Sequence, residues 1–218
     1  SSVMAEKCVQ TGTPVVLFNR YVRVRNVSSV CCDNTEGGQL VANLLLDAGH
    51  KRFAYIAGSE NTSTNVDRER GFIDRLEERG SAPPLREVGN YTYHGGRDAV
   101  KRLLQSHDPP DAIFCANDIM ALGVLDTVRC DYSIKVPEDM SIIGFDDIRA
   151  AAWPSYDLTT IRQQIDEMIN VTVDILLARI DDPEAEPVMR LVPGQLIVRS
   201  SARLAEATGG ERPVLAGR

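Results

Sequence analysis

Short apolar runs alternate along the chain with longer stretches in which apolar residues recur every three or four positions. The short runs are bounded by polar residues or glycine, which is typical of buried strands. Strands are therefore predicted at residues 14–19, 28–33, 52–58, 85–89, 112–116, 141–146 and 158–163, with two shorter ones around Pro193 and Gly194.

The stretches between these strands have the spacing of amphipathic helices. From Glu36 the apolar positions recur at helical spacing until Gly49 ends the pattern. The other predicted helices follow the Asn-, Ser- and Thr-rich loop at 59–65 or span 95–106, 118–129 and 164–181. Strands that alternate with helices of about ten to fifteen residues indicate a parallel sheet with right-handed crossovers. The predicted fold class is α/β with a doubly wound parallel sheet.

The composition of the 218 residues is that of an ordinary globular protein, with 43% hydrophobic and 25% charged residues. The formal net charge of -7 argues against a nucleic-acid surface over most of the chain, because phosphate binding needs a basic footprint. No signal peptide and no apolar run of about 18 residues is found, so we expect no membrane partner and a cytoplasmic location. The five cysteines lack C-x-x-C spacing, which fits buried thiols in a reducing compartment.

The usual catalytic signatures are missing from the sequence. It has no G-x-S-x-G elbow, no G-x-x-x-x-G-K-[ST] phosphate loop and no H-E-x-x-H motif. The three histidines, His50, His94 and His107, fall in different segments, where solvated or capping roles outweigh metal ligation. We therefore expect a protein that is not an enzyme and that has no cofactor and no metal site.

Polar residues follow the predicted strands at the edge where an open α/β sheet binds ligands. They are Arg68, Arg70, Tyr91, Asn117, Asp118, Asp146 and Asp147. An arginine fork, a carboxylate, an amide and an aromatic face together suit a small polyhydroxylated or planar molecule. The alternative is a helix cap for the aspartates and the asparagine, a solvated helix face for the arginines, and a surface position for the tyrosine.

Six motifs occur in the order and spacing of the lac repressor and purine repressor family. They lie at residues 33–58, 67–80, 111–129, 136–148, 158–163 and 196–201. Together they make the chain resemble this family over nearly all of residues 14–203. The family comprises bacterial transcription regulators, in which an amino-terminal helix-turn-helix domain is joined to an effector-binding core similar to periplasmic sugar-binding proteins.

The resemblance implies six effector-binding residues: Arg68, Asn117, Asp146, Tyr91, Asp33 and Gln163. Arg68 matches the arginine that grips the effector, and Tyr91 matches the position of a stacking aromatic ring. Asn117 and Asp146 match polar effector contacts, whereas Asp147 is expected to shape the turn. Asp33 matches a pocket residue, and Gln163 lies near the last crossover, where family members add a further contact.

The resemblance also implies how the chain is divided, with one complete core subdomain and part of a second. The expected segments are a remnant of the amino-terminal subdomain (1–50), the carboxyl-terminal subdomain (51–157), a crossover and returning helix (158–185), terminal strands (186–204) and a disordered tail (205–218). The helix-turn-helix domain that would contact operator DNA is expected to be absent from this chain.

The function implied is that of an effector-sensing core, in which a small molecule controls operator binding by a homodimer. A sugar or sugar derivative is the expected effector, and a purine is also compatible with the predicted residues. The main alternative is a solute-binding protein of a sugar transport system, which shares the fold but would carry a secretory signal and fewer free thiols. A second alternative, an α/β enzyme acting on sugars or nucleotides, would need a nucleophile, a metal cluster or an acid/base pair in the cleft. The only close carboxylate pair is Asp146 and Asp147, whose adjacent side chains should diverge.

Overall fold

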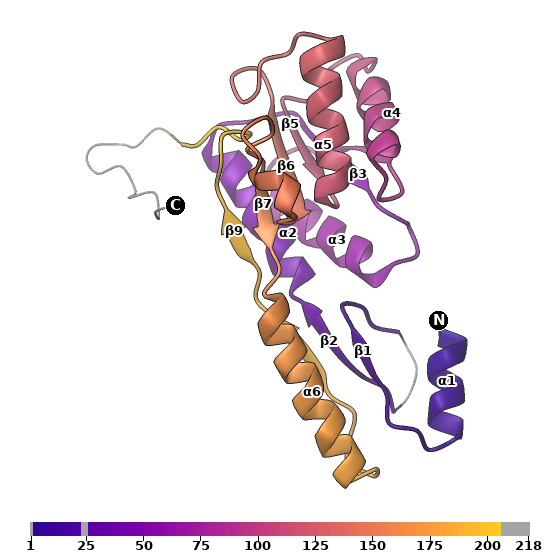
Figure 1. Cartoon of the computed structure of the whole chain (residues 1–218). Helices are drawn as coiled ribbons and strands as arrows, with labels where there is room; N and C mark the ends of the chain where they lie inside the picture. The colour runs from indigo at the N-terminus through magenta and orange to yellow at the C-terminus, as the bar shows by residue number, and fades with distance from the viewer. Residues whose placement is uncertain (1, 23–25, 206–218) are drawn as a thin grey trace, which may run out of the picture.

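The chain forms two β-sheets, a larger one with helices on both faces and a smaller one with one long helix packed against it, and the computed structural model describes residues 2–22 and 26–205 (Figure 1). The α-helices of the described residues are α1 (Ser2–Gln10), α2 (Asn34–Asp47), α3 (Ser63–Glu78), α4 (Tyr93–Leu104), α5 (Asp118–Asp126) and α6 (Ile165–Asp181). Two shorter helical segments are the π-helix η1 (Thr127–Asp131) and the 3-10 helix η2 (Arg149–Ala152). The strands are β1 (Val16–Phe18), β2 (Ser28–Cys32), β3 (Phe53–Ala57), β4 (Leu85–Val88), β5 (Ala112–Cys115), β6 (Ser141–Asp146), β7 (Thr159–Arg162), β8 (Met189–Val192) and β9 (Gln195–Ile197).

The larger sheet has six strands in the order β4-β3-β5-β6-β7-β9, and only β9 runs antiparallel to its neighbour. Its central strands are fully buried because helices cover both faces, as in other parallel sheets. Neighbouring residues of β6 show which helix lies on which face. A Cβ added at Gly144 would lie 2.1 Å from Asp118 Oδ1 of α5, whereas a Cβ added at Gly37 of α2 would lie 2.6 Å from the Phe145 ring. Since Gly144 and Phe145 point to opposite faces, α5 and α2 do not share a face.

Helices α2 and α3 pack against each other at very short range. A Cβ added at Gly38 would lie 2.3 Å from the carbonyl oxygen of Arg68, and one added at Gly71 would lie 2.0 Å from that of Thr35. Only glycine allows two helix backbones to approach this closely. The approach brings the first turn of α2 beside the side chain of Arg68.

The smaller sheet has three parallel strands in the order β1-β2-β8, and α6 packs against them. The chain crosses between the two sheets at β2–α2, at β7–α6 and at β8–β9. Only Met168 of α6 is buried among the described residues of that helix, and Ile169, Val173 and Leu177 on another side are exposed. None of the helices in the described ranges is both long and apolar enough to span a bilayer.

The predicted α/β fold class is confirmed, and the predicted strands are all present. The pattern predicts no helix at residues 2–10, where α1 lies, and the other main differences lie at helix ends. Helix α2 begins at Asn34 rather than Glu36, because Asp33 caps it by accepting a hydrogen bond from the Glu36 N–H at 2.9 Å. Helix α3 begins at Ser63, inside the expected loop at 59–65. Helix α5 ends at Asp126 and continues as the π-helix η1.

The expected segment 1–50 contains elements that lie with both sheets. Within it, α2 packs against α3 and reaches Phe145 of the larger sheet. The apolar side of α2, with Val41 and Leu45, is buried in the main hydrophobic core. Of the strands and helices in that range, β1 and β2 belong to the smaller sheet. The tail expected to be disordered lies, from residue 206 onward, outside the described residues.

Candidate ligand-binding pocket

A pocket of about 420 Å³ lies where the loops at the carboxyl ends of the parallel strands meet. Its lining comes from the loops after β1, β3, β4 and β5, from α3 and from the end of β6. The lining residues are Asn19, Arg20, Tyr21, Val22, Asn61, Thr62, Ser63, Thr64, Arg68, Tyr91, Asn117 and Asp146. Four of the six predicted site residues are among them, namely Arg68, Tyr91, Asn117 and Asp146.

Arg68 is the most deeply buried charged group of the pocket, with 3% of its surface exposed. Each of its guanidinium nitrogens donates a hydrogen bond: Nε to Asn34 Oδ1 at 2.8 Å, Nη1 to the Ala116 carbonyl at 2.5 Å, and Nη2 to Asp146 Oδ1 at 3.4 Å. The guanidinium carbon also lies 3.6 Å from the centroid of the Phe145 ring, a cation–π distance. Arg68 is thus fixed by partners from α2, β6 and the end of β5.

Asp146 ends β6 in a strained backbone conformation, with φ at 119°. A non-glycine residue in this region costs free energy and persists where the surroundings enforce it, which is common at functional sites. Its Oδ1 also accepts a hydrogen bond from Gln163 Nε2 at 2.7 Å. Burial raises the pKa of Asp146, and the Arg68 charge and the Gln163 hydrogen bond oppose that shift. The Asp146 carboxylate is therefore held between two donors, Arg68 and Gln163, at the carboxyl end of β6.

Asn117 combines a capping role with a place on the pocket wall. Its Oδ1 accepts a hydrogen bond from the Met120 N–H at 3.0 Å and so caps α5. Its amide nitrogen makes no hydrogen bond within residues 2–22 and 26–205, so this donor is available to a ligand. Asn117 can therefore cap α5 through its side-chain oxygen and contact a ligand through its amide nitrogen.

The remaining two predicted residues, Gln163 and Asp33, lie outside the lining. Gln163 is 8% exposed and reaches the site through Asp146, and its Oε1 is buried without a hydrogen-bond partner in the described part of the chain. Asp33 instead caps α2 and does not line the pocket. We therefore leave Asp33 out of the proposed site, because it does not line the pocket.

The sequence prediction missed the lining residues at 19–22 and 61–64. Asn19 ends the predicted strand 14–19, so the rule that selected Asn117 and Asp146 would have selected it too. Its Oδ1 is buried without a partner among the described residues. Thr62 and Thr64 lie in the expected loop at 59–65, where no site residue is predicted from the sequence, and their hydroxyls lie beside the Tyr91 hydroxyl.

A serine–histidine–aspartate relay lies at the amino ends of the strands of the larger sheet, at the edge opposite the pocket. His50 Nε2 lies 2.8 Å from Ser141 Oγ, and His50 Nδ1 lies 3.3 Å from Asp111 Oδ1. Ser141 is fully buried, however, and its hydroxyl also accepts from the Arg203 N–H at 2.9 Å. Burial, and then the Arg203 charge, lower the pKa of His50. The relay holds the carboxyl-terminal segment against the sheet and gives a substrate no access.

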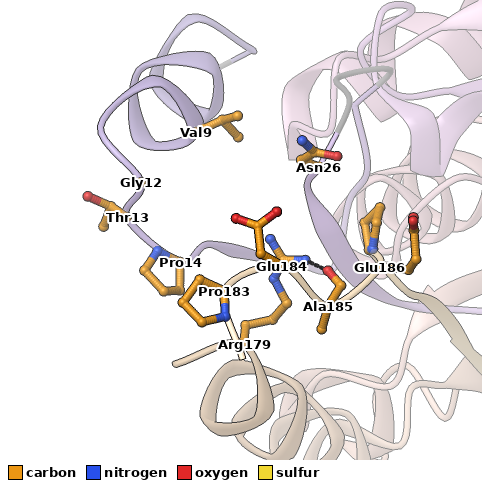
Figure 2. Close-up of a pocket in the computed structure, with 11 residues that line it drawn as sticks. Val9, Gly12, Thr13, Pro14, Asn26, Arg179, Pro183, Glu184, Ala185 and Glu186 are labelled. Carbon is orange, nitrogen blue, oxygen red and sulfur yellow. Dashed lines mark hydrogen bonds between the residues drawn. The ribbon is translucent and has the colours of Figure 1, made fainter. Parts of the chain in front are cut away.

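A second pocket, of about 290 Å³, lies between the end of α1 and the loop after α6 (Figure 2). It contains none of the predicted site residues. Arg179 points toward the loop and donates a hydrogen bond to the Ala185 carbonyl, with Glu184 beside it (Figure 2). No group of three or more His, Cys, Asp or Glu side chains in the described ranges is placed to hold a metal ion.

Comparison with known proteins identifies the fold. The family model described as periplasmic binding protein-like domain matches residues 42–202. The HTH-type transcriptional repressor CytR of Escherichia coli (strain K12) is 34% identical over 192 residues, which cover 87% of this chain and 56% of that protein. The chain spans little more than half the length of the curated relatives it matches, 59% and 56% for two of them.

Two solved structures are similar over almost the whole chain. A complex of the transcriptional regulator CelR with cellobiose has a TM-score of 0.85 at 31% identity and covers 91% of this chain and 62% of that one. A LacI family transcriptional regulator from Enterococcus faecium with bound ribose has a TM-score of 0.83 at 26% identity, and the match covers 94% of this chain and 76% of that one.

The chain therefore belongs to the periplasmic binding protein-like domain family. Within it, the relatives are LacI-type transcriptional regulators, which confirms the resemblance stated from the sequence motifs. The same relatives do not favour the alternative of a solute-binding protein for transport, since they control transcription.

Proposed function

We propose that the chain is the effector-binding core of a DNA-binding transcriptional regulator and that the 420 Å³ pocket receives the effector. The observation that carries the proposal is the convergence of four side chains from α3, the loops after β4 and β5, and the end of β6 onto one pocket: Arg68, Tyr91, Asn117 and Asp146. The residues of the loop after β1 close the same pocket from the smaller sheet. A ligand held between two sheets is placed to influence how they are arranged.

The chemistry of the pocket supports a sugar or sugar derivative as the effector. Asn19, which lines the pocket, carries a buried oxygen without a donor in the described ranges, and the hydroxyl groups of a sugar are such donors. The positive charge of Arg68 is already paired with Asp146, so a ligand does not need to be anionic to satisfy it. The similar structures with cellobiose and ribose bound are in line with this proposal.

In the complete protein we propose a homodimer whose two DNA-binding heads read a two-fold operator. The effector would prefer one arrangement of the two sheets, and that preference would change operator affinity. Because the relatives regulate transcription, we place the protein in the cytoplasm and propose no catalytic activity, no cofactor and no membrane partner. The buried Ser141 relay gives no reason to add a hydrolase function.

A thermal-shift screen of the complete natural protein against sugars, sugar phosphates and nucleobases tests the proposal. A ligand at 100 times its dissociation constant adds about 2.7 kcal/mol to the stability of the folded state. We expect a sugar to raise the melting temperature, and the increase should disappear in Asp146→Asn but persist in Arg102→Met, which alters an exposed ion pair with Glu87. No stabilisation by any member of the panel would contradict a small-molecule effector.

A further inference from the structure

The turn at the end of β6 brings Asp146 to the pocket in a backbone conformation that non-glycine residues rarely adopt. Asp146 has φ at 119°, and Asp147, the next residue, has φ at 55°. Two successive positive φ values cost free energy, and such a turn persists only where its surroundings enforce it. The Asp147 side chain does not line the pocket, so its partners must lie elsewhere.

Asp147 is buried between two arginines. Its side chain is 7% exposed, its Oδ2 accepts a hydrogen bond from Arg162 Nε at 2.7 Å, and its Oδ1 accepts one from Arg199 Nη2 at 2.7 Å. Hydrogen bonds between ionised groups are about twice as strong as those between neutral groups. Arg199 is itself fixed, because its Nη1 donates to the Leu158 carbonyl at 2.7 Å. We name Asp147, Arg162 and Arg199 the Asp147 clamp.

The Asp147 clamp joins the turn to the segments that cross between the two sheets. Arg162 ends β7, from which the chain passes to α6 beside the smaller sheet. Gln195 lies opposite Arg162 and begins β9, which comes from β8 of the smaller sheet and lies beside β7 (Figure 1). Arg199 follows β9 closely. The turn that presents Asp146 is therefore attached to the chain next to both crossings.

We propose that Asp147 is a positioning residue, because the clamp holds the Asp146 carboxylate where it accepts from Gln163. The proposal rests on the proposed function and goes beyond it, since Asp147 lies outside the pocket lining and yet sets the affinity of the pocket. Gln163 directly follows Arg162, so one clamp fixes both the donor and the acceptor of the hydrogen bond between Gln163 and Asp146. A ligand that displaces Asp146 also displaces, through the clamp, the segments that cross between the sheets.

A different arrangement would give Asp147 a purely structural part. Asp118 Oδ2 accepts a hydrogen bond from the Ile148 N–H at 2.8 Å and so also holds the turn. If that bond alone fixes the turn, Asp147 serves only to hold the segment after β9 against the sheet. Loss of the Asp147 charge would then lower stability and leave Asp146 in place. The two arrangements therefore differ in what happens to the hydrogen bond between Asp146 and Gln163.

The first test needs no ligand and observes the Gln163 side-chain amide by NMR in the complete natural protein. That amide donates to the Asp146 carboxylate at 2.7 Å, so its proton signal should lie downfield of its position in Asp146→Ala. Asp147→Asn removes the charge and keeps the size, and asparagine tolerates a positive φ, so the variant isolates the ion pairs. We expect the Gln163 signal in Asp147→Asn to move most of the way to its position in Asp146→Ala.

The matched control is Asp111→Asn, which neutralises a partly buried aspartate at the opposite edge of the same sheet. Both variants should lower the urea midpoint, whereas only Asp147→Asn should move the Gln163 signal. An unchanged signal in Asp147→Asn would overturn the positioning role, whatever the pocket binds.

A second pair of variants keeps the test decisive if Asp147→Asn does not fold. Arg162→Met removes one arm of the clamp from an arginine that is 46% exposed, and Arg102→Met alters a similarly exposed arginine that is paired with Glu87. We expect a smaller displacement of the Gln163 signal, in the same direction, in Arg162→Met and none in Arg102→Met. Equal signals in these two variants would contradict the clamp.

The second test measures affinity by isothermal titration with ribose, cellobiose and uridine as probes. For a probe that binds, Asp147→Asn should lower affinity by about three- to tenfold, because a displaced Asp146 loses part of a hydrogen bond to a charged group. Asp111→Asn should leave the affinity of the same probe unchanged. Equal affinities in Asp147→Asn and Asp111→Asn would overturn the proposal.

The two tests separate failure of this inference from failure of the proposed function. If the Gln163 signal depends on Asp147 but no probe binds, Asp147 positions Asp146 as described and the effector site is what fails. If probes bind and the signal is independent of Asp147, the effector site stands and the positioning role is wrong.

Discussion

Replacing Arg68 with methionine would remove a guanidinium group from the centre of the pocket wall. The side chain is 4% exposed and donates hydrogen bonds to Asn34, the Ala116 carbonyl and Asp146. Removing one partner of a buried ion pair costs about 3–5 kcal/mol, because the remaining charge stays buried without compensation. The Asp146 side chain is 29% exposed, so water screens part of that cost and we expect a loss of about 3 kcal/mol.

Urea unfolding followed by circular dichroism measures this loss as a change in midpoint at constant slope. The matched control is Arg102→Met, which alters an arginine that is 49% exposed and paired with Glu87, and its cost should stay below about 1 kcal/mol. Adding Asp146→Asn to Arg68→Met should recover part of the loss, because a neutral amide replaces the unpaired carboxylate. A cost for Arg68→Met that is no larger than that of the control would refute the argument.

Three further predictions concern groups outside the Arg68 pair. Burial raises the pKa of Asp118 to about 7, so the folded state binds this proton more tightly than the unfolded state, and stability falls as pH rises from about 4 to about 7. Urea unfolding at pH 5, 6, 7 and 8 should show a weaker fall in stability for Asp118→Asn than for the natural protein. Equal slopes of stability against pH in the two proteins would contradict the shift. Burial lowers the pKa of His50, so stability should be lost as pH falls below about 6.5, and the same series should show a smaller loss in His50→Asn than in the natural protein. Asp33→Ala should cost about 1 kcal/mol through loss of the α2 cap and should leave ligand affinity intact, as checked by unfolding and isothermal titration.

The larger sheet could be predicted well from the sequence, because its strands are continuous apolar runs. Strand β6, expected at 141–146, has those bounds in the structure. The carboxyl ends of parallel strands lie at one edge, which is why Asn117, Asp146 and Tyr91 could be placed at one pocket before their contacts were known. These predictions depend on hydrophobic periodicity, which is a local property of the sequence, and on strand direction, which follows from the alternation of strands and helices.

The burial of Arg68 could not be predicted from the residues alone. It lies in the charge run Asp-Arg-Glu-Arg, which by itself indicates a solvated helix face. Its partners come from positions 34, 116 and 146, so its environment depends on how α2, β5 and β6 pack together. Asp33, which the resemblance places in the pocket, caps α2 and lies outside the pocket lining, and neither position could be read from the residues alone.

The most direct test of the effector pocket compares two helix caps, of which only one lines it. Asn117→Ala and Asp33→Ala each remove a side-chain acceptor from a helix amino terminus, and each should cost about 1 kcal/mol of stability. The measurement is the affinity of both variants of the complete natural protein for the sugar that stabilises it most, by isothermal titration. We predict at least a tenfold loss for Asn117→Ala and no loss for Asp33→Ala. Equal affinity in both variants would contradict the assignment of this pocket as the effector site.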